Sequence, residues 1–150
     1  MKKSPQLEKL EEVLRSSKLV AGGFMGTDSR SVTEIIDADA AAVAKLGYTP
    51  GRLAHRMKQI TDAAVKGLGT TVKIDDRIQA AVIEAKGSIV CPWPHPGHFH
   101  KRVTAVKSLD SARTSRWSDL NIHLIEKHGF FEGKGSPYRI EPNDLIELIF

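Results

Sequence analysis

The chain has 150 residues, of which 41% are hydrophobic and 27% are charged, so it is long enough to bury one core and is expected to fold as a single domain over residues 1–150. No run approaches the roughly 20 apolar residues that cross a bilayer. The two lysines near the N-terminus are not followed by the apolar core of a signal peptide. We therefore expect a cytoplasmic protein with no membrane partner. Lysine and arginine total 22 against 18 acidic residues, for a formal net charge of +4, but the charges are interspersed, so nucleic-acid binding is allowed and not favoured.

Three helices are expected in the first half of the chain, and each begins at a recognisable cap. A serine-proline pair and a threonine-proline pair precede the first and the third, and proline is favoured in the first turn of a helix. Ser31 and Glu34 have the spacing of a capping box, which marks the start of the second. The expected spans are residues 6–17, 31–46 and 50–66.

From residue 70 the sequence changes to the alternating pattern of strands. The expected strands cover residues 70–75, 78–85, 88–91 and 101–109. Lys86 and Gly87, between the second and the third, predict a tight turn. Two more helices are expected at residues 118–128 and 143–150. The fold class that follows is α+β, with three N-terminal helices, an antiparallel sheet of three or four strands, and C-terminal helices packed on the sheet.

The segment CPWPHPGHFH, residues 91–100, concentrates side chains that bind transition metals. It contains the only cysteine of the chain and three of its six histidines, namely Cys91, His95, His98 and His100. Zinc favours thiolate and imidazole ligands, and the prolines of the segment limit the conformational freedom that is lost on binding. We therefore predict that Cys91 and two of these three histidines bind a zinc ion or another transition metal, with His128 or Asp39 as the remaining ligand.

Two helical side chains are expected to face the same interior and to offer a further ligand. Asp39 falls in the middle of the apolar stripe of the second helix, where a carboxylate needs a partner such as Arg30 or an imidazole. His128 projects with the apolar residues of its helix, whereas His123 lies opposite and is expected to be solvated. Because five residues on a helix are about 140° apart, we do not expect the two histidines to share an ion.

The same residues allow a second interpretation, in which Cys91 is a catalytic nucleophile. A thiol needs a base to take its proton, and His128 oriented by Asp39 or Asn121 would provide one. The catalytic candidates are therefore Cys91, His128 and Asp39. A third interpretation is an ordinary loop, in which the cysteine is buried and the histidines are exposed.

Two glycine-rich segments, residues 22–28 and 133–136, lie close to cationic residues in the sequence. Backbone N–H groups in such turns can bind an anion, and Arg30, Lys134 and Arg139 are the nearest cations. A small acidic molecule is therefore the expected partner, with these three residues as its ligands. The predicted function is binding of that molecule, and in one version its conversion, at the Cys/His site.

An alternative function is DNA binding. Residues 43–60, VAKLGYTPGRLAHRMKQI, resemble the core of a helix-turn-helix motif, with a helix, a short turn after Gly47 and a second helix from Pro50. The resemblance covers some 18 residues of the chain. It implies that the exposed polar residues of the second helix contact DNA, namely Arg52, His55, Arg56 and Gln59.

Overall fold

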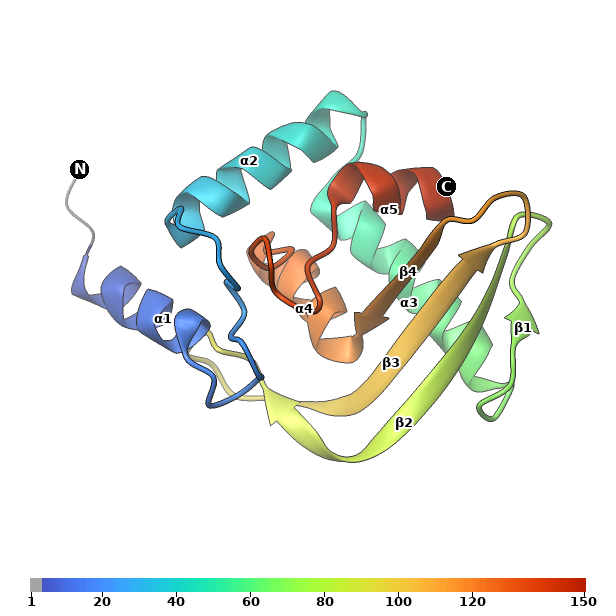
Figure 1. Ribbon diagram of the computed structural model, residues 1–150, viewed down its shortest axis with the longest axis horizontal. Helices are drawn as coiled ribbons and strands as arrows, with labels where there is room; N and C mark the ends of the chain where they lie inside the picture. Colours follow the sequence, from blue (N-terminus) through green and yellow to red (C-terminus); the bar gives the residue numbers. More distant parts are fainter. Residues whose placement is uncertain (1–3) are drawn as a thin grey trace.

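The computed structural model describes residues 4–150, in which five helices accompany a four-stranded antiparallel sheet (Figure 1). The helices are α1 Pro5–Arg15, α2 Val32–Lys45, α3 Pro50–Val65, α4 Asp119–His128 and α5 Pro142–Ile149. The strands are β1 Val72–Lys73, β2 Ile78–Val90, β3 His98–Ser108 and β4 Thr114–Ser118. This confirms the expected α+β class. No helix within the described range is long and apolar enough to span a bilayer, and the two N-terminal lysines lie outside that range.

Side-chain caps set the helix starts that the sequence predicts. Ser4 and Thr49 each accept a hydrogen bond from the backbone N–H three residues further on, at 3.1 Å in both helices. Ser31 and Glu34 form the capping box of α2. Ser118 forms a second capping box at the start of α4, with an asparagine as its partner. The caps therefore fix where α4 begins and with it the positions of its histidines.

The strands form a meander in the order β1-β2-β3-β4, and each neighbouring pair is antiparallel. The tight turn expected at Lys86 and Gly87 is wrong, because β2 runs unbroken over Ile78–Val90. Its register against β3 shifts between Glu84 and Ser88, which marks an irregularity of the bulge type. Gly87 has a φ of 95°, a conformation that occurs in bulges and in turns. The glycine therefore marks a positive φ, as a turn would require, but here it belongs to the irregularity within β2.

The start of β3 and the presence of β4 also differ from the expectation. β3 begins at His98, three residues before the predicted start, so His98 and His100 belong to the sheet and not to the proline-rich loop. β4 pairs with β3 over Thr114–Ser118, where no strand was expected. The prediction of three or four strands is correct in number. However, two of the predicted strands form the single strand β2, and the fourth strand is β4, which was not predicted.

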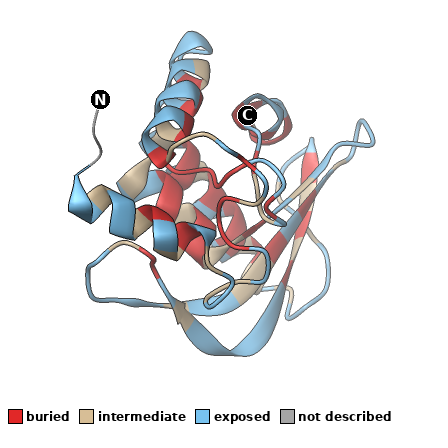
Figure 2. Ribbon diagram, turned by 60° about the vertical axis from the view of Figure 1, so that its left-hand side comes forward, coloured by how far each residue is buried: buried red, intermediate tan, exposed pale blue. Residues whose placement is uncertain are grey.

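Buried residues, which are red in Figure 2, form two clusters. The sheet cluster lies between α3, α5 and the strands, and contains Trp117, whose ring N–H donates to the Thr61 hydroxyl at 2.9 Å. The N-terminal cluster joins α1, the start of α2 and one side of α4, and includes Leu14, Phe24 and Cys91. α4 contributes to both clusters, so it is the element that connects them.

The segment that resembles a helix-turn-helix forms the end of α2, a turn and most of α3. All four of its expected DNA contacts have partners inside the protein, and two of them, His55 and Gln59, contact each other at 3.3 Å. The Arg52 guanidinium lies 4.5 Å from the centre of the Tyr48 ring. Arg56 donates to a backbone carbonyl of α5 at 3.0 Å and pairs with Asp75 at 2.8 Å. DNA binding stays a prediction, but Arg56 already contacts α5, and Arg52 lies 5.4 Å from the ring of Phe150, the residue that follows α5.

Candidate metal centre

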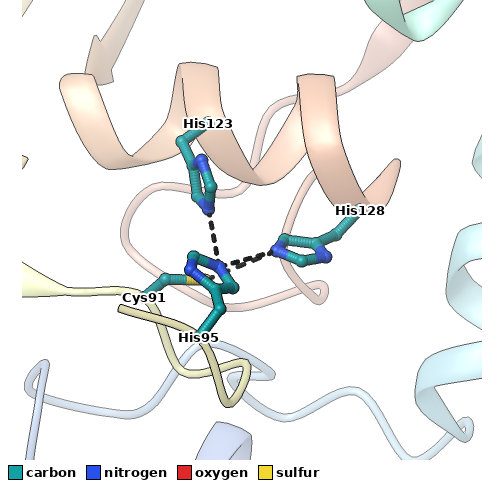
Figure 3. Close-up of side chains that lie close together, drawn as sticks. All are labelled: Cys91, His95, His123 and His128. Atoms are coloured by element: carbon teal, nitrogen blue, oxygen red, sulfur yellow. Dashed lines mark hydrogen bonds between the residues drawn. The ribbon is translucent and has the colours of Figure 1, made fainter. Parts of the chain in front are cut away.

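Four side chains converge between the end of β2 and α4: Cys91, His95, His123 and His128 (Figure 3). One potential ligand atom from each lies within 4.8 Å of the others. Cys91 directly follows β2 and His95 comes from the proline-rich loop, whereas both remaining histidines project from α4 toward that loop. The cluster therefore joins two segments that are distant in sequence.

The proline-rich loop lies against α4 through ring contacts, and a hydrogen bond within the loop orients His95. The Trp93 ring stacks on His128 with centroids 4.2 Å apart and planes 7° apart. His95 Nδ1 lies 3.0 Å from the carbonyl oxygen of Pro96. Because a carbonyl only accepts, Nδ1 carries the proton, and Nε2 keeps a free lone pair directed at the cluster. Such a second contact is how metal-binding histidines are usually oriented.

Three of the six distances between the four ligand atoms are close to the edges of a tetrahedron around one ion. Zinc with tetrahedral angles and bonds of about 2.0–2.3 Å separates two nitrogens by roughly 3.3 Å and sulfur from nitrogen by roughly 3.6 Å. In the structure His95 Nε2 lies 3.3 Å from His128 Nε2 and 3.1 Å from His123 Nε2. Cys91 Sγ lies 3.5 Å from His128 Nε2. These three separations are compatible with a shared ion, and the remaining pairs of ligand atoms lie within 4.8 Å of one another, so the group could hold a metal ion.

Hydrogen bonds alone do not account for this arrangement. His128 Nε2 meets both Cys91 Sγ and His95 Nε2, and His95 Nε2 meets both other imidazoles. A ring nitrogen has either one proton or one lone pair, directed along a single line in the ring plane, so it cannot satisfy two partners at once. A cation at the centre would satisfy all four atoms together.

Burial and mutual repulsion set the protonation states of the cluster. Burial, followed by the charges of His123 and His95, lowers the pKa of His128 to about 4. Burial and His95 also lower the pKa of His123, and burial raises the pKa of the Cys91 thiol. The lowered pKa values favour the neutral forms of His123 and His128 near pH 7, which leaves both rings a lone pair for a metal. The same shifts oppose a thiolate–imidazolium pair, which the nucleophile interpretation requires.

Of the metal ligands predicted from the sequence, Cys91 and His95 are in the cluster, and so is His128, the expected further ligand. His98 and His100 are not, which corrects the prediction. Both belong to β3, where the His98 ring lies 3.4 Å from the Ser88 hydroxyl and His100 is paired with Ser88 in the sheet register. The early start of β3 carries them away from the cluster.

His123 is the ligand that the sequence analysis missed. It was expected to be solvated, but it is half-buried and its ring lies 4.4 Å from the Phe99 ring. The helical angle gives only the direction in which each side chain leaves the backbone. Both side chains then bend toward the loop, so the ring centroids of His123 and His128 are 5.2 Å apart. Four residues between two histidines fall within the H-x3-5-H spacing of zinc sites, which is the signal that would have identified the pair.

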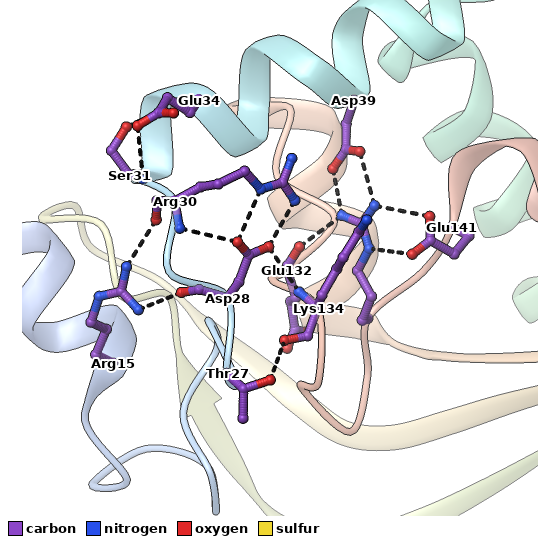
Figure 4. Close-up of polar contacts among 11 residues, drawn as sticks. Arg15, Thr27, Asp28, Arg30, Ser31, Glu34, Asp39, Glu132, Lys134 and Glu141 are labelled. Atoms are coloured by element: carbon purple, nitrogen blue, oxygen red, sulfur yellow. Dashed lines mark hydrogen bonds and ion pairs between the residues drawn. The ribbon is translucent and has the colours of Figure 1, made fainter.

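Asp39 is buried as expected, but its partner is neither Arg30 nor an imidazole (Figure 4). Its carboxylate accepts two hydrogen bonds from Arg139, one of them at 2.9 Å, and Arg139 also pairs with Glu141. Asp39 is not among the residues whose ligand atoms converge at Cys91. It therefore joins α2 to the loop before α5 and does not orient a catalytic histidine.

The three cations expected to bind an acidic molecule lie near carboxylates of the chain (Figure 4). Arg30 pairs with Asp28 at 2.7 Å, and Arg139 is bound by Asp39. The backbone N–H of Lys134 donates to Asp28 at 3.1 Å. The bond from Lys134 to Asp28 joins the two glycine-rich segments to each other. Both guanidinium groups thus have anionic partners within the protein.

Asn121, the other candidate for orienting the base, is also engaged elsewhere. Its side-chain amide donates to the Glu132 carboxyl at 2.6 Å, and its side-chain oxygen accepts from the Ser118 backbone at 2.8 Å.

Comparison with known proteins found no matching family model, no matching curated protein and no matching solved structure. The functional argument therefore depends on the geometry of the Cys/His cluster.

Proposed function

We propose that the protein binds one zinc ion through Cys91, His95, His123 and His128, and that the ion has a structural role. The observation that carries this proposal is a set of three separations between ligand atoms, from 3.1 to 3.5 Å, which match the edges of a zinc tetrahedron. The ring nitrogens of His95 and His128 each make two of these contacts, which is more than one proton or one lone pair can satisfy.

A structural role is supported by the number and origin of the ligands. Four protein ligands complete the tetrahedral shell of zinc, whereas catalytic sites generally keep one position for water or substrate. Cys91 is 5% exposed and belongs to the N-terminal cluster, and two ligands come from α4. The ion would therefore hold the loop after β2 against α4, where few other bonds join the two segments.

The test is metal analysis of protein purified without a histidine tag. Wild type is expected to contain about one zinc ion per chain after dialysis. Cys91→Ser and His123→Ala each remove one ligand and are expected to lose most of the ion. His98→Ala and His100→Ala are the matched controls, because these histidines lie in the same segment but outside the cluster, and they are expected to retain it.

Cobalt substitution adds a readout that does not depend on affinity alone. Cobalt in the site is expected to give the absorption of a tetrahedral ion with a thiolate ligand, and Cys91→Ser is expected to remove the thiolate band. The proposal fails if wild type contains no stoichiometric ion, or if the control variants lose it as readily as His123→Ala does.

A further inference from the structure

A second site is suggested by a cavity of about 420 Å³ that lies between the curved part of β2–β3 and two loops, residues 19–24 and 132–138. Most of its walls are apolar: Leu19, Phe24, Ile89, Val103, Leu120 and Tyr138. This volume falls in the range of small-molecule sites, which are commonly apolar with a few polar groups that orient the ligand. None of the four metal ligands lines the cavity, so it is separate from the metal centre.

The charges that line the cavity are mainly positive and come from β3. His100, Lys101 and Arg102 line it in succession. Arg102 is neutralised by Asp119 at 2.7 Å. Lys101 is exposed and forms no ion pair with any residue in the described range. Lys101 is thus the cation available to a ligand whose apolar part occupies the cavity.

The acidic group of the cavity adds little negative charge. Glu132 is 4% exposed and accepts hydrogen bonds from Ser136 and Asn121, both at 2.6 Å. Burial raises its pKa to about 7, so a large fraction of the carboxyl is protonated near neutral pH. The apolar walls and the cation from β3 therefore determine which ligand the site favours.

We propose that this cavity binds a small amphipathic carboxylate, with its apolar chain against Phe24 and Leu120 and its carboxylate beside Lys101. The apolar chain is removed from water by the walls, and the carboxylate remains at the exposed side, where it needs no buried partner. This site for an acidic molecule differs from the one expected from the sequence, because Arg30, Lys134 and Arg139 do not line it.

Isothermal titration calorimetry of the complete chain with octanoate, octylammonium and acetate tests the proposal. Octanoate is expected to bind, octylammonium to bind at least about tenfold more weakly, and acetate not to bind measurably. Lys101→Glu is expected to weaken octanoate binding about tenfold. Lys86→Glu is the matched control, since Lys86 is an exposed lysine on the neighbouring strand that does not line the cavity, and it is expected to leave binding unchanged.

Filling the cavity gives an independent test. Ala85 is exposed on β2 and lines the cavity, so Ala85→Phe is expected to fold normally and to lose octanoate binding. The proposal is overturned if octylammonium binds as tightly as octanoate, if octanoate gives no binding heat, or if the two lysine variants affect its binding equally. Cys91→Ser is expected to keep octanoate binding, which separates this site from the metal centre.

Discussion

Glu132 is the residue whose environment departs most from that of an ordinary surface carboxyl. It is buried, its φ is 68°, and both carboxyl oxygens accept hydrogen bonds, from Ser136 and Asn121. Positive φ is unfavourable for a residue with a side chain, so the surrounding contacts must hold this conformation. The Ser136 hydroxyl also lies 3.3 Å from the carbonyl oxygen of Gly23. When Glu132 is protonated, its carboxyl can donate to the Ser136 oxygen while the Ser136 hydroxyl donates to Gly23.

Because the folded pKa of Glu132 is about 7 against an ordinary 4.5, the native state favours the protonated form. The resulting stabilisation is fully present below pH 4.5 and is lost as the pH rises through about 7. The shift corresponds to about 3 kcal/mol. Glu132→Gln cannot ionise, so we expect its free energy of unfolding to match wild type near pH 5 and to exceed it by about 2–3 kcal/mol at pH 8.

Urea denaturation at pH 5 and pH 8 measures this difference. Asp76→Asn, at a fully exposed acid, is the control and is expected to leave the pH dependence of wild type unchanged. If Glu132→Gln loses as much stability as wild type between the two pH values, the carboxyl does not titrate in the folded protein as described.

At the scale of elements, the loops at 22–28 and 130–137 pack backbone against backbone. The N–H of Gly133 donates to the carbonyl of Phe24 at 2.8 Å, and the N–H of Thr27 donates to the carbonyl of Lys134 at 3.1 Å. A Cβ on Gly133 would lie 2.3 Å from the carbonyl oxygen of Met25, which is closer than side-chain atoms approach. The loop pair is therefore possible only with glycine at this position.

Gly133→Ala is expected to lower the free energy of unfolding by at least about 2 kcal/mol, because the clash is with backbone and cannot be relieved by a rotamer change. Gly51→Ala is the control. No atom lies within 4 Å of its added Cβ, and alanine favours the helix, so it is expected to stabilise α3 by up to about 1 kcal/mol. Thermal or urea unfolding measures the free energy of unfolding of both variants. Equal values for Gly133→Ala and Gly51→Ala would contradict the close contact between the loops at 22–28 and 130–137.

Local sequence signals predicted the helices well and the sheet less well, for a physical reason. Ser31 with Glu34 and Ser118 act within one turn of chain, so their effect can be inferred from spacing. Gly87 permits positive φ, but whether that conformation makes a turn or a bulge depends on the pairing of β2 with β3. That pairing is a tertiary property, which a local pattern does not contain.

The candidate site shows the same division. Cys91, His95 and His128 could be selected from residue type and helical face. The helical face excludes His123, and only its spacing to His128 points to it, because its inclusion depends on where the proline-rich loop crosses α4. Conversely, His98 has suitable chemistry and a suitable position in the sequence. It is excluded because β3 starts at that residue.

In the whole molecule, α4 connects the sheet cluster to the N-terminal cluster, and the Cys/His cluster lies where α4 meets the N-terminal cluster. Cys91 is itself a member of that cluster. The sheet cluster has its own hydrogen-bonded interior, with Trp117, Thr61 and Thr104 joined at 2.6–2.9 Å. Removal of the metal should therefore loosen one part of the molecule more than the other.

We expect a chelator to lower the free energy of unfolding by about 3–4 kcal/mol when the reference state contains free zinc at 100 to 1,000 times its Kd. Hydrogen exchange followed by mass spectrometry should show faster exchange in residues 91–97 and the second half of α4, because without the ion only ring contacts such as Trp93 on His128 join them. Amides of α3 and the paired centre of β2 should change little. Cys91→Ser should exchange like chelated wild type and should not respond to the chelator. Equal acceleration throughout the chain, or none near the cluster, would contradict a zinc ion that holds the loop to α4.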